Sequence, residues 1–152
     1  ARALELGYHG TSFKNCKGVF RGIAAACLIR KLQHDNPPAG YVLSGEDLGN
    51  IGPVALLQDL AVATTLGIES IERNGHHFFA GLSAFPQRVQ EQVLHHHHDL
   101  YVASMLGWPT VRIDCGELNL RSVVAAPLGV GFQIDVDQFT PVSPQPKQAD
   151  HR

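Results

Sequence analysis

The feature that most constrains this chain is a repeated order of short apolar run, polar loop and helix. Residues 8–15, 41–44 and 68–72 have the composition of strands, and their starts recur about every 30 residues, the length of one βαβ unit. Helical patterns follow the first two, at residues 19–32 and from Pro53 to a stop at Gly67. Repeated β/α order predicts parallel strands and an α/β fold.

The remaining segments complete the expected organisation. Residues 1–6 fit the last turn of a helix that ends at Gly7, and a helix is expected over residues 87–105. Residues 110–114 and 117–120 are expected to form a hairpin around Cys115 and Gly116. Residues 123–135 are apolar and rich in glycine, so we expect a non-helical segment that packs across the outside of the domain. We expect one domain over residues 1–140 and a loose tail from Pro141 to the end.

Charge and cysteine usage exclude several classes of partner. A formal net charge of -2 provides no basic surface for nucleic acid and no polybasic segment for a membrane, so neither partner is expected. No apolar run reaches the roughly 18 residues of a membrane helix. Cys16, Cys27 and Cys115 lack CxxC spacing, which favours free thiols, a reducing compartment and a cytoplasmic location.

The start of the chain suggests part of a longer domain. The sequence begins at Ala1 without methionine and enters a strand within ten residues, which we interpret as the start of a fragment. A few parallel strands alone leave unpaired edges, so we expect an isolated chain to form a homo-oligomer.

Polar residues gather where the expected strands end. Because active sites of β/α barrels lie at the carboxyl ends of the strands, these residues are the candidate site. Strand alternation places Lys14 on the face opposite Phe13. The candidates are Lys14 and Lys17 after the first strand, with Lys14 as the leading catalytic candidate. Glu46 and Asp47 after the second strand are expected to bind polar groups of a substrate or to hold Lys14, and Glu72, Asn74, His76 and His77 at the third are expected to contact the substrate and set specificity.

Each candidate also has a simpler interpretation. Lys14 and Lys17 have the character of surface lysines beside a strand. Glu46 and Asp47 could serve only as acidic residues near the start of the helix from Pro53. Histidines in a loop are usually solvated. Within the run His95–His98, only the two end residues would share a face of a helix, which favours adventitious metal binding over a built metal site.

Three segments in order resemble the carboxyl-terminal half of the barrel domain in the enolase superfamily, especially its mandelate-racemase and muconate-lactonizing branches. Residues 13–18 (FKNCKG) resemble the end of the sixth strand, and residues 43–52 (LSGEDLGNIG) resemble the seventh-strand loop. Residues 116–118 (GEL) and 126–135 (APLGVGFQID) are similar to the closing hairpin and the segment after it. At Val19 and Phe20 the chain departs from the family, which more often has a second glycine there.

The resemblance implies a partial (β/α)8 TIM-type barrel of about three β/α units, with a hairpin and a capping segment. It implies an isomerase or lyase, namely a racemase, epimerase, dehydratase or cycloisomerase. Such an enzyme removes a proton next to the carboxylate of a small substrate. Lys14 would be the base or acid and Lys17 would orient it or contact the substrate anion. Mg²⁺ would be the cofactor, with its ligands on earlier strands outside this chain, where the first catalytic lysine also lies.

A second interpretation is a non-catalytic α/β module. It would bind metal through its histidines or self-associate through the exposed edges of its sheet.

Overall fold

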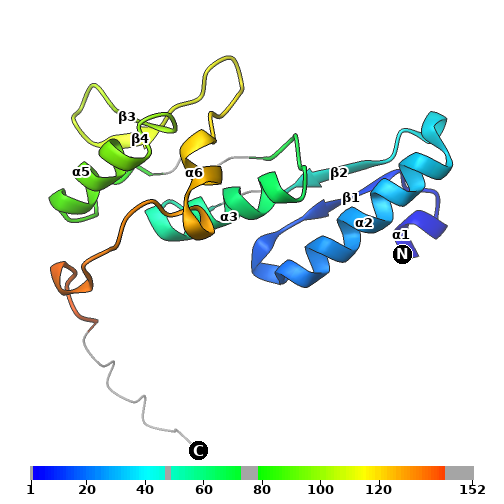
Figure 1. The fold of residues 1–152 in the computed structure, drawn as a ribbon, viewed down its shortest axis with the longest axis horizontal. Coiled ribbons are helices and arrows are strands. Elements are labelled where there is room, and N and C mark those ends of the chain that lie inside the picture. The colour runs from blue at the N-terminus through cyan, green and yellow to red at the C-terminus, as the bar shows by residue number, and fades with distance from the viewer. Residues whose placement is uncertain (1, 47–48, 73–78, 143–152) are drawn as a thin grey trace, which may run out of the picture.

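The computed structural model describes residues 2–46, 49–72 and 79–142. Figure 1 shows an elongated molecule, in which the first β/α units lie at one end and a small hairpin with helix α5 lies at the other. The fold is mixed α/β, and the described residues form two sheets of two strands each.

The helices are α1 (Arg2–Glu5), α2 (Val19–Asp35), α3 (Pro53–Thr65), α5 (Gln87–His96) and α6 (Arg121–Ala125). The strands are β1 (Gly10–Phe13), β2 (Val42–Gly45), β3 (Tyr101–Ala103) and β4 (Pro109–Val111). Short 3₁₀ turns are η1 (Asn15–Lys17), η2 (Pro37–Ala39), η3 (Pro127–Gly129) and η4 (Val136–Gln138).

The first two strands confirm the parallel order predicted from the sequence. β1 and β2 pair in parallel over their full lengths, from Gly10 opposite Val42 to Phe13 opposite Gly45, with α2 as the connection. The predicted third strand is reduced to one parallel bridge between Gly45 and Ile71. The chain therefore runs through three parallel segments in sequence order. A barrel stays a prediction, because the described residues contain too little parallel sheet to define one.

Helix α2 packs on β1 through Phe13, whose side chain is only 4% exposed. Gly22 faces the Phe13 ring, and a Cβ at that position would collide with it, so only glycine allows this close approach. Gly18, with φ of 106°, turns the chain from η1 into α2. This contact fixes how the end of β1 meets the start of α2.

Helix α3 belongs to both hydrophobic cores. Leu57 and Leu60, both fully buried, pack in a core with residues of α5, β3 and α6. Ala63 and Leu66 pack in the second core with Phe13. Figure 1 shows α3 in the middle of the molecule, next to the β1–β2 unit and overlapped in this view by α6, with which it packs. Pro53 starts the helix at its first turn.

The helix predicted over residues 87–105 is wrong beyond His96. The chain turns after α5, where the backbone N–H of Tyr101 donates to the His97 carbonyl at 2.8 Å, and β3 then pairs antiparallel with β4. His97 is fully buried, and its ring bonds to groups on other segments. Tertiary packing therefore overrides the local helical pattern.

Two other boundaries also need correction. The strand of the predicted hairpin at residues 110–114 pairs instead with β3, and only one bridge, Asp114 to Glu117, joins the expected partners. The segment 123–135 is not wholly non-helical, because α6 continues to Ala125. The short helix ending near Gly7 is confirmed, with α1 over Arg2–Glu5 and φ of 91° at Gly7. Most of the predicted tail, residues 143–152, lies outside the described residues.

Candidate functional site

Lys14 follows β1 directly and keeps an extended backbone, with φ of -142° and ψ of 119°. Strand alternation turns Phe13 into the core and leaves Lys14 on the other face, as predicted. Its Nζ lies 3.8 Å from Oε2 of Glu46, with side-chain exposures of 38% and 36%. The two predicted residues therefore meet at the carboxyl ends of adjacent parallel strands.

The backbone of Glu46 is positioned by the sheet. Its backbone N–H donates to the Phe13 carbonyl at 2.8 Å, which continues the pairing one residue beyond β2. The hydroxyl of Ser12 donates to Oε1 of Glu46 at 2.8 Å. This hydrogen bond, followed by the positive charge of Lys17, holds the pKa of Glu46 below its usual value. Desolvation opposes this lowering, and the charge of Lys14 adds to it. Glu46 is therefore a carboxylate at neutral pH.

A small cleft of about 240 Å³ lies beside this pair. Its charged lining is Lys14, Lys17, Arg21 and Glu46, so three cations face one carboxylate. Within the described ranges, Lys17 and Arg21 form no ion pair. The surplus of positive charge favours an anionic ligand, and a guanidinium suits a carboxylate because it can donate two parallel hydrogen bonds.

The other predicted site residues are less defined. Glu72 is exposed and follows the third parallel segment, where its backbone N–H donates to the Gly45 carbonyl at 3.1 Å. Asp47, Asn74, His76 and His77 lie outside the described residues. The structure thus brings Lys14, Lys17 and Glu46 together and leaves the rest of the predicted substrate contacts as predictions.

The histidine run does not form a shared helical face. Because α5 ends at His96, His95 and His98 are not one turn apart on a helix, and Nδ1 of His98 lies 3.4 Å from the His95 carbonyl oxygen. The ring of His96 stacks on Phe132 at 5.6 Å between centroids. Over the residues that were searched, which are the described ones, no group of three or more histidine, cysteine or acidic residues is placed to hold a metal ion.

His97, which is buried, belongs to a polar cluster with the half-buried residues Ser122 and Asp99. Its Nε2 accepts from the Gly131 N–H at 3.0 Å, so Nδ1 carries the proton and donates to the Ser122 hydroxyl oxygen at 2.9 Å. Asp99 accepts from the Ser122 N–H at 2.9 Å. Burial, partly opposed by the charge of Asp99, lowers the pKa of His97.

This cluster contains the residue types of a hydrolase triad, but the donor and acceptor roles of its histidine are opposite to those that catalysis requires. A catalytic histidine must accept the serine proton, whereas His97 donates to Ser122 and its acceptor nitrogen is occupied by Gly131. The cluster instead joins the end of α5 to α6 and to the segment after η3.

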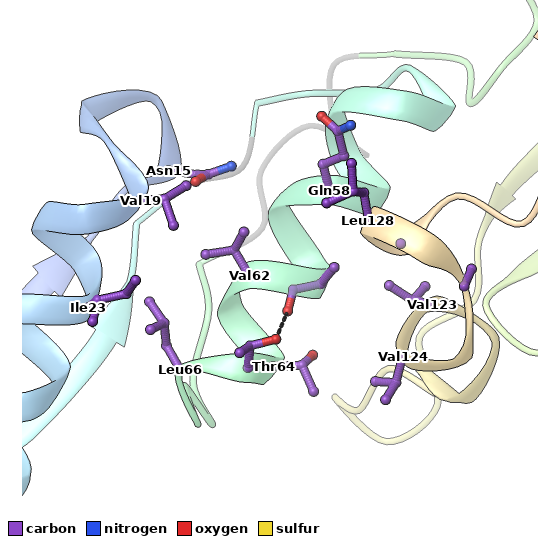
Figure 2. Close-up of a pocket in the computed structure, with 14 residues that line it drawn as sticks. Asn15, Val19, Ile23, Gln58, Val62, Thr64, Leu66, Val123, Val124 and Leu128 are labelled. Carbon is purple, nitrogen blue, oxygen red and sulfur yellow. Dashed lines mark hydrogen bonds between the residues drawn. The ribbon is translucent and has the colours of Figure 1, made fainter.

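A larger cavity, of about 650 Å³, lies over α3. Figure 2 shows Val62 and Leu66 of this region between Val19 and Ile23 on one side and Val123, Val124 and Leu128 on the other. Its lining is mostly apolar and contains no charged side chain. This cavity can accept apolar groups but has no residue for proton transfer.

Ser12 and Arg21 were not predicted as site residues. Ser12 shares a strand face with Lys14, and the spacings of three and four residues from Lys14 to Lys17 to Arg21 repeat a helical turn. Those two patterns were the available signals. These two sequence patterns do not predict the turn at η1 and Gly18, and it is this turn that brings the three cationic side chains into one cleft.

No family model, curated protein or solved structure gives a significant match to this chain. Among its described helices, none combines the length and apolar character needed to cross a membrane.

Proposed function

We propose that this chain forms the carboxyl-terminal, lysine-bearing part of an enolase-superfamily barrel. The complete enzyme would remove a proton from the carbon next to a carboxylate in a racemase, epimerase, dehydratase or cycloisomerase reaction. The observation that carries this proposal is the 3.8 Å approach of Lys14 Nζ to Glu46 Oε2 across the ends of two parallel strands. The resemblance of residues 13–18 and 43–52 to the family supports the same assignment.

Each residue of the cleft has a role in this proposal. After the Lys14 ammonium has lost a proton to solvent, its neutral amine accepts the substrate proton as the C–H bond breaks and the electron pair moves toward the substrate carboxylate. The ammonium that re-forms can return a proton in the second step. Glu46 keeps the Lys14 side chain at the strand end. Lys17 and Arg21 bind the substrate carboxylate and stabilise the negative charge that develops on it.

In this proposal Mg²⁺ is a cofactor of the complete enzyme, and its ligands lie on strands outside this chain. The part of the chain that the structure describes contains no set of residues that fits the ion, so no step here is assigned to it. Glu72, Asp47, Asn74, His76 and His77 stay as proposed substrate contacts. A reducing, cytoplasmic setting is also proposed, and the three exposed free thiols are compatible with it.

The test is solvent exchange at carbon. The full-length protein is incubated in D₂O with a panel of small carboxylates, and deuterium incorporation next to the carboxylate is followed by NMR. We expect exchange with at least one compound and a loss of at least about 100-fold in Lys14→Met. Lys31→Met is the matched control, because Lys31 also pairs with an acid, Asp35, but on the exposed side of α2. Absence of exchange across the panel, or full exchange in Lys14→Met, would refute the proposal.

The edge of the small parallel sheet supports a second candidate, a self-associating module. Among the described residues, β1 pairs only with β2, so its other edge has no partner strand, and a strand of a second chain would supply one. Light scattering of the isolated chain decides this alternative, which predicts a concentration-dependent dimer. Metal binding through His76, His77 and the run His95–His98 stays a prediction, because His76 and His77 lie outside the described residues. His97 does not take part in it as the structure stands, since both of its ring nitrogens are hydrogen-bonded within the chain.

A further inference from the structure

A buried carboxylate lies where the loops after the two parallel strands meet. Asp59, on α3, is only 7% exposed. Its Oδ1 accepts from Nδ2 of Asn15 at 2.6 Å, and its Oδ2 accepts from Nδ2 of Asn50. One side chain of α3 thus joins the loop just before that helix to a turn that lies 44 residues away in sequence.

The carboxylate of Asp59 is the acceptor in both hydrogen bonds, and the two asparagine side chains are the donors. A carboxylate only accepts hydrogen bonds, so both asparagines must present their NH₂ groups to it. Figure 2 shows the amide nitrogen of Asn15 directed toward α3. The other amide atom of Asn15, Oδ1, is buried and has no hydrogen-bond partner among the described residues, so within this part of the chain the contact to Asp59 is what orients the side chain.

Packing alone does not require an acid at this position. The neighbouring buried residues of α3 include Leu56, Leu57 and Leu60, and a buried carboxylate is costly unless its oxygens are hydrogen-bonded. Both donors here are neutral amides, so the contact is not an ion pair. What Asp59 provides is two acceptors that hold two separate loops at one distance from α3.

Those two loops carry the proposed catalytic pair. Asn15 follows Lys14 directly and begins η1, whose first turn closes through the Lys17 N–H to the Lys14 carbonyl at 3.0 Å. Asn50 lies in the loop that leads from Glu46 to α3. We propose that Asp59 is a positioning residue, which sets Lys14 and Glu46 in register by holding Asn15 and Asn50. This assignment rests on the proposed function of the cleft.

The readout is the pKa of Glu46, measured by NMR of its side-chain carboxyl in the protein without substrate. Asp59→Asn keeps the shape of the side chain but presents an NH₂ to one asparagine, so one loop is released. We expect the Glu46 pKa to rise toward the ordinary glutamate value as Lys14 and Lys17 move away. Removal of the Asp59 charge alone would shift this pKa in the opposite direction, because it removes a negative neighbour.

Asn15→Ala and Asn50→Ala each remove one arm of the contact without changing the charge. Both are expected to raise the Glu46 pKa, and they decide the question if Asp59→Asn does not fold. Leu60→Val is the control, since it weakens α3 in the core around Leu57 and should leave the Glu46 pKa unchanged. An unchanged or lowered Glu46 pKa in the folded Asp59→Asn, Asn15→Ala and Asn50→Ala variants would overturn the assignment.

The outcome is independent of the test for catalysis. If the Glu46 pKa rises but no carboxylate exchanges deuterium, Asp59 positions the pair and the proposed reaction is wrong. If exchange occurs and the pKa does not rise, the reaction stands and the positioning role of Asp59 is wrong.

Discussion

The Lys14–Glu46 pair and the His97 cluster use polar side chains for different purposes. Lys14 and Glu46 are each more than one third exposed, and water screens an ion pair at such positions, so the pair contributes little to stability. His97 is fully buried, and both of its ring nitrogens are hydrogen-bonded within the chain. A contribution to stability therefore accounts for the His97 cluster but not for the Lys14–Glu46 pair. This difference is consistent with a role for the Lys14–Glu46 pair in binding or catalysis.

The largest effect on stability is expected at His97. His97→Leu leaves the Gly131 N–H and the Ser122 hydroxyl without their buried partner, which should lower the free energy of unfolding by about 2–3 kcal/mol. Urea unfolding followed by circular dichroism measures it. His95→Leu, at the exposed start of the run, is the control and should change this free energy by less than about 0.5 kcal/mol. Equal losses of unfolding free energy in His97→Leu and His95→Leu would contradict a stabilising role for the His97 cluster.

The buried histidine should also make stability depend on pH. Because burial lowers the pKa of His97 in the folded state, the unfolded chain binds the proton more readily. Stability is therefore full above the ordinary histidine pKa of about 6.5 and falls as pH drops below it toward the lowered value, by at most about 1.4 kcal/mol per pH unit.

Urea unfolding at pH 7.5, 6.5 and 5.5 measures this slope. His97→Gln should remove the contribution of this residue, and His95→Gln should retain it. A steeper loss in His97→Gln than in the wild type would contradict a neutral buried His97.

A smaller change in stability is expected at the cleft. Lys14→Met and Glu46→Gln should each change the free energy of unfolding far less than His97→Leu does, since the pair is exposed and screened by water. Thermal unfolding of the two variants beside the wild type measures this. A loss as large as that of His97→Leu would mean that the pair is structural.

The smallest effect concerns the charge of Glu46. Ser12→Ala removes the hydrogen bond that contributes most to its lowered pKa, so this pKa should rise while β1 and β2 stay paired. Carboxyl NMR titration follows the change. Thr11→Ala, on the other face of the same strand, serves as the control, and an equal rise in that variant would assign the effect to the strand rather than to the Ser12 hydroxyl.

Local patterns were sufficient to predict the first part of the fold. Strand alternation separated Phe13 from Lys14, and the order of short strand, loop and helix predicted the parallel pairing of β1 with β2. These features depend on neighbours within a few residues or on one βαβ unit. The position of Glu46 beside Lys14 follows directly from that pairing.

Long-range contacts decided the features that the sequence could not predict. Residues 95–98 continue a helical pattern, but the bonds of His97 to Ser122 and Gly131 end the helix and allow β3 to pair with β4. Asp59 is an acid on a leucine-rich helix, and its two hydrogen-bond donors, Asn15 and Asn50, are known only from the structure. Periodicity carries no information about such partners.

The most direct test of Lys14 as the proton-transfer group is rescue by a free amine. Lys14→Ala in the full-length protein should lose deuterium exchange next to the substrate carboxylate, and added ethylamine should restore it by at least about tenfold, because the amine can enter the space left by the side chain. Lys17→Ala should show no such rescue. Undiminished exchange in Lys14→Ala, or a loss that ethylamine restores equally in both variants, would contradict the assignment of Lys14.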